Sequence, residues 1–391
     1  MDIFPINPDK YHVCQEYGFM IKEPLEFLPA YFSAWNVLAK QMPELVGKKE
    51  LRAAVNKMPL LDVDRLCGYR EHRLAHVQLS LIGAAYIWQE GDIGVAKELP
   101  KCLSVPWVAV SRWLGIQPIL SHSSLVLANC RYDTQSGLIE SLYNLPGGSE
   151  AAWFVTVTAQ VELAFATGIK DLLLALYHAQ CGDLEALTSD LLSLPDMLYR
   201  MQTAVAKMHE KLSAETFYDI MRPFLNGWGG ASSPLPDGVI YRGISDQPVK
   251  MTGGSAAQSS TLQCIDAVLG VQHEPEIGEF LQNMRRYMPT LHRQFIETIE
   301  EHSKVKSLVE SSENEALTSA YNQALQAVID FRSYHVQIVT KYIVVMANRK
   351  SRNKEYEALA TRGTGGSSIL PFLKSLRTTT SNTKIPEAQT E

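Results

Sequence analysis

The sequence predicts an all-α protein, and three observations support this fold class. Apolar residues recur at spacings of three and four along most of the 391-residue chain. Alternating runs of β-branched residues bounded by turns are scarce. Breaks that contain proline or glycine, such as MPLLD and GIQP, separate the helical patterns. With 46% hydrophobic and 20% charged residues, the chain has an ordinary globular composition, enough for one large or two ordinary domains.

The first third predicts a small helical domain. Its helical patterns lie near residues 25–42, 49–56, 71–89 and 106–114. The stretch LYNLPGGSE at 142–150 then combines a proline, a glycine pair and Ser149 as a potential helix cap. We therefore expect residues 1–145 to form the N-terminal domain.

Residues 146–391 predict a larger helical domain. The segment 151–179 is apolar almost all round, with a possible break at Gly168, as expected of a central helix. Further helices are expected at 184–225, 258–270, 276–300 and 314–347, and a short one at 369–376. The Gly/Ser/Pro-rich stretch 226–257 is long for a loop inside a domain, and such loops are usually functional. The tail 378–391 is expected to be disordered.

Charge and cysteine usage narrow the class of function. A net charge of −6 and a pI near 6.0 offer no basic face for nucleic-acid phosphates, so no nucleic-acid partner is expected. The N-terminus lacks the pattern of a secretory signal, and no apolar run approaches the roughly 18 residues of a membrane span. Six cysteines are scattered without a CxxC pair, which favours a reducing compartment. We expect a cytoplasmic protein without a membrane span.

The strongest local feature is FRSYHVQIVTKY at 331–342, because the usual catalytic signatures are absent. Helical spacing places His335 on an apolar stripe with Phe331 and Ile338. A lone histidine there is most often a core residue, yet a haem needs only one protein ligand on its proximal side. Arg332 could reach a haem propionate, pair with Asp266 or remain a surface cation.

Several sequence blocks, taken together, resemble the indoleamine 2,3-dioxygenase family. They are EYGF (16–19), REHRLAH (70–76), SLVLAN (124–129), FLNGW (224–228), GGSAAQSS (253–260), MRRYMP (284–289), RSYHVQIVTKYI (332–343) and RGTGG (362–366). The resemblance covers about residues 11–377. It implies an all-helical, two-domain protein with one haem b in the large domain, beneath the small one. His335 matches the proximal haem ligand, and Arg332 and Asp266 match a pair near the haem edge.

The resemblance also implies the substrate-binding side of the site. Phe154 matches a residue that packs on the substrate indole, and Thr158 stands close to the indole N–H. Phe217 matches a pocket residue, and Arg222 matches the group that grips the substrate carboxylate. Without the resemblance, each of these side chains has an ordinary interpretation: core packing for the phenylalanines, a helix surface for Thr158 and a solvated charge for Arg222.

Two further segments are implied to close the site. Ser255 and Ala256 match a loop near the haem that covers the substrate. Thr364 lies in a glycine-rich segment that matches a mobile lid, here 348–368, whose glycines would let it fold and open. His122 and Leu125 stand where the best-characterised branch has Tyr and Cys, and they are more similar to the second vertebrate paralogue, whose affinity for tryptophan is poor.

The implied activity is a haem-dependent dioxygenation. Both atoms of O2 would enter the indole C2–C3 bond of L-tryptophan to give N-formyl-L-kynurenine, the first step of the kynurenine pathway. Because the haem works in its ferrous form, the resemblance implies a reductant such as cytochrome b5, and we expect a monomer. Such chemistry suits a chain without an acid–base dyad, since the protein positions the reactants and excludes water.

Two alternatives have other functions. A haem-binding oxygen carrier or sensor could keep His335 and lack turnover, although it would have no use for a carboxylate clamp. A low-activity paralogue could instead signal through Tyr241, because VIYRGI at 239–244 fits a loose inhibitory phosphotyrosine pattern. Trp107 occupies the position where some relatives have a second such tyrosine, so a paired motif is not available.

Overall fold

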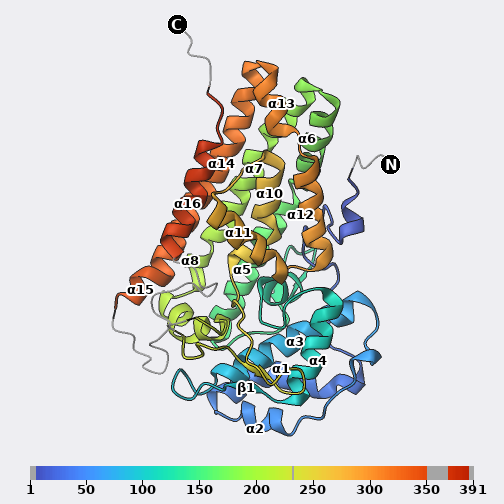
Figure 1. Cartoon of the computed structure of the whole chain (residues 1–391), viewed down its shortest axis with the longest axis vertical. Helices are drawn as coiled ribbons and strands as arrows, with labels where there is room; N and C mark the ends of the chain where they lie inside the picture. Colours follow the sequence, from blue (N-terminus) through green and yellow to red (C-terminus); the bar gives the residue numbers. More distant parts are fainter. Residues whose placement is uncertain (1–5, 231–232, 350–368, 387–391) are drawn as a thin grey trace.

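The structure is a computed structural model that describes residues 6–230, 233–349 and 369–386. At one end of the molecule, coloured blue to cyan in Figure 1, the first helices pack around α3, most of whose residues are buried. An apolar helix surrounded in this way needs neighbours on every side. These helices are α1 (Ser33–Gly47), α2 (Leu51–Asn56), α3 (Gly68–Trp88) and α4 (Lys101–Leu114).

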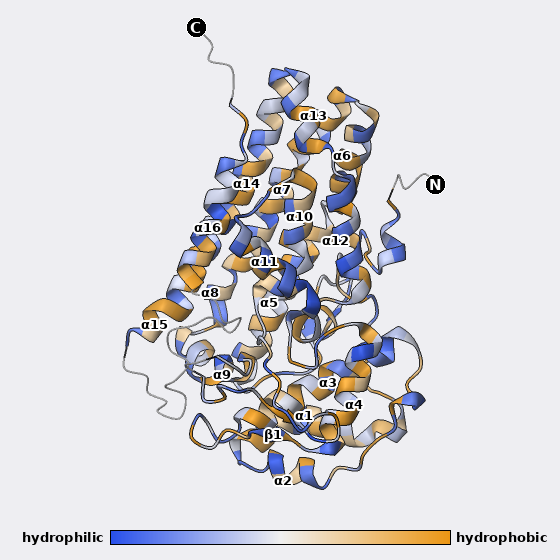
Figure 2. Cartoon of the chain, viewed as in Figure 1, coloured by the Kyte–Doolittle hydropathy of each residue, from blue (hydrophilic) through white to orange (hydrophobic). Residues whose placement is uncertain are grey.

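Longer helices run together toward the other end of the molecule (Figure 1). Helix α7 packs against α5, α6 and α14, and α14 packs against α16. Apolar and polar residues occupy different sides of most helices (Figure 2), the pattern of helices that share one core. The helices are α5 (Gly148–Ala166), α6 (Ile169–Cys181), α7 (Leu184–Ala206), α8 (Met208–Lys211), α9 (Arg222–Leu225), α10 (Ser260–Leu269), α11 (Pro275–Met284), α12 (Thr290–His302), α13 (Val305–Ser312), α14 (Glu315–Val339), α15 (Val345–Ala347) and α16 (Ile369–Asn382).

Strands are few and short within the described ranges, so the all-α prediction is confirmed. Strand β1 (Glu98–Leu99) pairs in parallel with β4 (Ile240–Tyr241), and β2 (Cys130–Tyr132) pairs antiparallel with β3 (Ile139–Ser141). Three helical turns of the described residues are π-helices, namely η4 (Ser123–Leu127), η5 (Thr216–Met221) and η8 (Thr340–Val344). The short 3-10 helices are η1 (Pro8–Tyr11), η2 (Ala30–Phe32), η3 (Val63–Arg65), η6 (Ala256–Gln258) and η7 (Arg285–Tyr287).

The expected break at Gly168 separates α5 from α6. A Cβ atom at Gly168 would lie 2.2 Å from the sulfur of Met197, so any side chain there would require Met197 of α7 to move. The start of α5 was less well predicted, because Gly147 (φ 125°) caps it and Ser149 does not. Glycine is needed at that positive φ.

The prediction of a disordered tail from residue 378 is wrong for the part that the structure describes. Helix α16 continues to Asn382, and Thr379 and Thr380 are buried against the fold. Threonine has a low helix propensity, so a run of threonines predicts that a helix ends. In the structure the hydroxyl groups of Thr380 and Thr383 donate hydrogen bonds to backbone carbonyls one turn earlier. The 348–368 segment lies outside the described residues beyond Arg349. The division at residue 145 stays a prediction.

One helical segment, Gly148–Cys181, has the length and mean hydropathy (1.3) that a membrane span would need. Half of its most apolar window is buried inside the fold, and the chain breaks within it at Gly168. Length and composition alone also fit the core helices of ordinary globular proteins. We interpret α5 and α6 as such core helices, because both pack against α7.

Candidate active site

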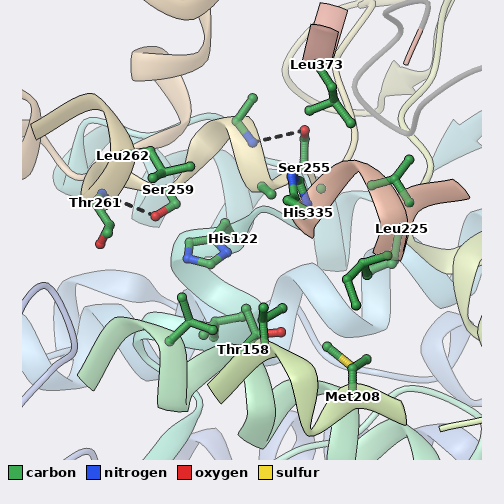
Figure 3. Close-up of a pocket in the computed structure, with 18 of the residues that line it drawn as sticks. His122, Thr158, Met208, Leu225, Ser255, Ser259, Thr261, Leu262, His335 and Leu373 are labelled. Atoms are coloured by element: carbon green, nitrogen blue, oxygen red, sulfur yellow. Dashed lines mark hydrogen bonds between the residues drawn. The ribbon is translucent and has the colours of Figure 1, made fainter. Parts of the chain in front are cut away.

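A cavity of about 310 Å³ lies among α5, α7, α14, α16 and the segment 254–263 (Figure 3). Its walls are mostly apolar. All three π-helices of the described chain contribute to it, through Leu125 from η4, Phe217 from η5 and Tyr342 from η8. Such turns occur frequently at functional sites, because they change which side chains face a given direction.

His335 lies on α14 and lines this cavity, as the apolar stripe predicts. Burial lowers its pKa to about 4, so the imidazole is neutral near pH 7 and keeps a lone pair for a metal. In the part of the chain that the structure describes, no cluster of three or more His, Cys, Asp or Glu side chains could hold a metal ion. A single neutral imidazole in an apolar cavity fits a haem, which brings its own four nitrogen ligands.

Arg332 pairs with Asp266, which was one of the three predicted possibilities. Its Nη2 donates to Asp266 Oδ2 at 2.6 Å, and its Nη1 donates to the Leu376 carbonyl at 3.3 Å and to the Thr380 hydroxyl. Burial alone would raise the pKa of Asp266, but Arg332 and His273 reverse this and hold it below its usual value. The pair therefore joins α14, α10 and α16 at the edge of the cavity.

Aromatic and cationic side chains form another part of the wall. Phe154 and Phe217 lie against each other with ring centroids 5.2 Å apart. Arg222 begins α9 directly after η5, is 2% exposed, and has its guanidinium 5.1 Å from the centroid of the Tyr218 ring. Burial lowers the pKa of Arg222. A guanidinium on a cavity wall matches a carboxylate, which it can pair through two parallel hydrogen bonds.

Close backbone contact brings the 253–258 loop beside the segment that carries Arg222. Gly254 donates to the Leu225 carbonyl at 2.8 Å, and Trp228 and Met251 exchange backbone hydrogen bonds. A Cβ at Gly253 would lie 2.2 Å from the Leu225 oxygen, so the glycine is required for this approach. The two sequence blocks FLNGW and GGSAAQSS, which carry part of the family resemblance, are therefore neighbours in space.

Ser255 and Ala256 line the cavity at the start of η6. Ser255 caps this turn by accepting from the Ala257 N–H at 3.2 Å. Gln258, which the sequence analysis missed, is fully buried and accepts from the backbone N–H groups of both Ser255 (3.2 Å) and His122 (3.1 Å). It thus ties the loop to the opposite wall.

A second missed residue is Glu162, which lines the cavity from α5, one turn after Thr158. It is 2% exposed and contacts His122, Ser259 and Thr261. The available signal was an acidic residue in the middle of a mostly apolar helix. Thr158 itself lines the cavity, and its hydroxyl donates to the Phe154 carbonyl at 2.8 Å. Thr364 lies outside the described residues.

Comparison with known proteins decides the family. A family model described as "Indoleamine 2,3-dioxygenase" matches residues 7–383. The chain belongs to the indoleamine 2,3-dioxygenase family. The predicted resemblance is confirmed, and with it the expectation of an oxidoreductase of the dioxygenase class.

Proteins with two different kinds of name are similar to this chain. The chain is 39% identical to "Indoleamine 2,3-dioxygenase 2" of Homo sapiens, over 95% of this chain and 94% of the relative. It is 36% identical to "Indoleamine 2,3-dioxygenase 1" of Rattus norvegicus, with the same coverage. It is also 44% identical to a "Myoglobin" of the abalone Haliotis madaka, over 95% and 97%. The chain is therefore similar both to proteins named dioxygenases and to a protein named myoglobin.

Proposed function

We propose that this protein is a haem-dependent dioxygenase that inserts both atoms of O2 into the indole C2–C3 bond of L-tryptophan and yields N-formyl-L-kynurenine. The observation that carries the proposal is the composition of one cavity wall. A buried arginine, Arg222, lines the same cavity as the aromatic pair Phe154 and Phe217, and His335 lines this cavity too. An amino acid with an aromatic side chain matches these groups.

Each of these residues has a physical task in binding the substrate. Arg222 offers a planar guanidinium that pairs a carboxylate through two parallel hydrogen bonds. Phe154 and Phe217 give the indole an apolar surface with ring edges and faces for packing. The mostly apolar walls exclude water, which strengthens the charge pairing inside the cavity. Together they hold the ring in one orientation, and such positioning lowers the barrier of a reaction between two bound molecules.

His335 would hold one haem b, and the Arg332–Asp266 pair would stand at its edge. Arg332 Nε has no partner among the described residues, so its N–H can donate a hydrogen bond to a propionate oxygen there. When bound, the haem supplies the O2-binding iron and the redox chemistry. We further propose that the protein is a cytoplasmic monomer with neither a membrane nor a nucleic-acid partner. A reductant such as cytochrome b5 would reduce the haem iron. The 348–368 segment, which includes Thr364, would cover the amino-acid end of the substrate.

An oxygen carrier is the second candidate, because abalone relatives at 44% and 42% identity are named myoglobins. A carrier needs an apolar pocket and one haem ligand, and this chain has both. It does not need a buried cation beside two aromatic rings. Arg222 therefore favours the enzyme, since a guanidinium that lines the cavity matches the carboxylate of an amino-acid substrate.

A phosphotyrosine signalling role has little structural support. Tyr241 is 1% exposed, and its hydroxyl donates to the Pro118 carbonyl at 2.7 Å. Trp107 is fully buried nearby. A kinase would have to unfold this region to reach the hydroxyl group.

The decisive experiment compares product formation with reversible oxygen binding. The haem-loaded, reduced protein is mixed with O2 and L-tryptophan, and N-formylkynurenine is measured by absorbance. The enzyme proposal expects product in wild type, a large loss in Arg222→Ala, and no change in Arg242→Ala, which alters an exposed ion pair with Glu98. If the oxygenated protein instead keeps a stable absorption spectrum that tryptophan does not change, and no product forms, the result would support an oxygen carrier.

A further inference from the structure

Glu162 is a buried carboxylate that accepts three hydrogen bonds on the cavity wall. Oε1 accepts from His122 Nε2 at 2.9 Å and from the Ser259 hydroxyl at 2.7 Å, and Oε2 accepts from the Thr261 hydroxyl at 2.6 Å. Burial alone would raise the pKa of Glu162, but these three donors outweigh it and lower the pKa. Glu162 is therefore ionised near neutral pH and can only accept hydrogen bonds.

This arrangement fixes the tautomer of His122. Ser259 also accepts from the Thr261 N–H at 3.2 Å, so its one hydroxyl hydrogen is directed to Glu162. Because a carboxylate cannot donate, the proton between Glu162 and His122 belongs to Nε2. We take the imidazole to be neutral: only one ring nitrogen then carries hydrogen, so Nδ1 of His122 carries a lone pair and acts as an acceptor.

That lone pair faces the cavity. His122 lines the cavity although the residue is only 7% exposed, and its Nε2 and backbone N–H are both engaged. No described residue supplies a hydrogen-bond partner for Nδ1, and this atom is not among the fully enclosed polar atoms. Figure 3 shows the ring directed into the space between Thr158 and the segment that carries Ser255 and Ser259. An acceptor without a donor in a cavity favours a ligand that carries an N–H or O–H group at that position.

The remaining polar groups nearby are less suited to accept from a ligand. The hydroxyl groups of Ser259 and Thr261 are occupied by Glu162. Thr158 donates its hydroxyl hydrogen to the Phe154 carbonyl, which leaves oxygen lone pairs beside a methyl group. Thr158 is thus the strongest competitor of His122, and it provides the matched control.

We propose that His122, oriented by Glu162, accepts the ring N–H of an indole substrate and makes the pocket selective for indoles over aromatic rings of the same shape that lack this donor. This inference rests on the proposed function. His122 would contact the substrate directly, and Glu162 would be a positioning residue. With Glu162 as its fixed partner, the His122 ring is already hydrogen-bonded on one side.

The test uses two ligands that differ in one group: L-tryptophan, and 3-benzothienyl-L-alanine, in which sulfur replaces the N–H. Their dissociation constants are measured from shifts of the haem absorption in the haem-loaded protein. A net hydrogen bond of ordinary strength gives wild type about a three- to tenfold preference for tryptophan. We expect His122→Phe to reduce this preference to about one. Thr158→Val changes the cavity wall for both ligands alike, so it should shift both dissociation constants and keep their ratio.

Glu162→Gln tests the positioning role. The amide can donate to Nε2 and so release the constraint on the tautomer. We expect the preference for tryptophan to fall while the affinity for the benzothienyl analogue stays the same. A merely structural role for Glu162 would weaken both ligands equally, and that result would overturn the positioning claim.

A measurement on wild type alone avoids variants that fail to fold. In the diamagnetic ferrous carbonyl protein, the ¹⁵N resonances of His122 report which ring nitrogen carries hydrogen. We expect hydrogen on Nε2 only, and an Nδ1 shift when tryptophan is added but not when the analogue is added. Hydrogen on Nδ1, or equal shifts with both ligands, would overturn the inference.

Three binding outcomes would also overturn it: no preference in wild type, a preference that survives in His122→Phe, or one that falls equally in Thr158→Val. In each of these cases tryptophan still binds and the proposed function stands. If tryptophan perturbs the haem spectrum of no variant and no product forms, the proposed function fails as well. The two failures are therefore distinguishable.

Discussion

Replacing Arg332 with methionine should destabilise the protein strongly. The guanidinium is 5% exposed and holds Asp266, the Leu376 carbonyl and the Thr380 hydroxyl together. Methionine has a similar length but no charge, so Asp266 would keep only His273, at 3.0 Å. Removing one partner of a buried ion pair typically costs about 3–5 kcal/mol, because the other charge is left uncompensated. We expect Arg332→Met to lose that amount of unfolding free energy.

The assay is urea unfolding of the haem-loaded protein, with haem content measured separately. The double variant Arg332→Met/Asp266→Leu removes both charges and should be markedly more stable than Arg332→Met. Arg200→Met is the matched control: its partner Asp196 is exposed, so the loss should stay within about 1 kcal/mol. A loss below about 1 kcal/mol in Arg332→Met, or a double variant no better than the single one, would refute the reasoning.

Three other predictions concern the same cavity. His335→Ala should lose most of its haem, measured as haem absorbance per protein; a variant with full haem content and an unchanged ferrous spectrum would contradict His335 as the ligand. Arg222→Ala should keep haem but lose about 2–4 kcal/mol of transition-state stabilisation, measured as kcat/KM for L-tryptophan; unchanged turnover at low tryptophan would assign the carboxylate to another group. The pKa of Asp266 in the folded protein lies below its ordinary value of 3.8. Ionised Asp266 therefore stabilises the folded state above about pH 3.8, and this stabilisation is lost as the pH falls through the pKa of the folded state. The urea midpoints of wild type and Asp266→Asn should therefore converge on acidification, and a constant gap would count against the ion pair.

Much of the fold follows from periodicity, because a helix that buries one face must repeat its apolar residues every three to four positions. This predicted α3, the α5–α6 break at Gly168 and the long α14. Packing that involves distant residues could not be predicted in this way. Thr379 and Thr380 look like a disordered tail in sequence, and only burial against α14 explains why α16 continues through them.

The site was predicted in part, and for a clear reason. Apolar spacing placed His335 in the interior, but the residues alone do not distinguish a haem ligand from a core histidine; the family resemblance did. Gln258 and Glu162 were missed, because their partners lie 136 and 40 residues away in sequence. Glu162 offered a signal, since a carboxylate in a helix that is apolar all round needs buried donors.

The three π-helices η4, η5 and η8 have a consequence for how this chain tolerates insertions and deletions. Each π-turn accommodates one residue more than an α-turn, so removing one residue there would restore a regular α-helix. At 3.6 residues per turn, the side chains beyond the deletion would rotate by about 100°. A deletion in η5 would turn Arg222 away from the cavity, and one in η8 would leave His335 in place but redirect the helix end after it. Most proteins tolerate insertions and deletions in the loops between helices. In this chain, a one-residue deletion in a π-helix would change which side chains face the cavity.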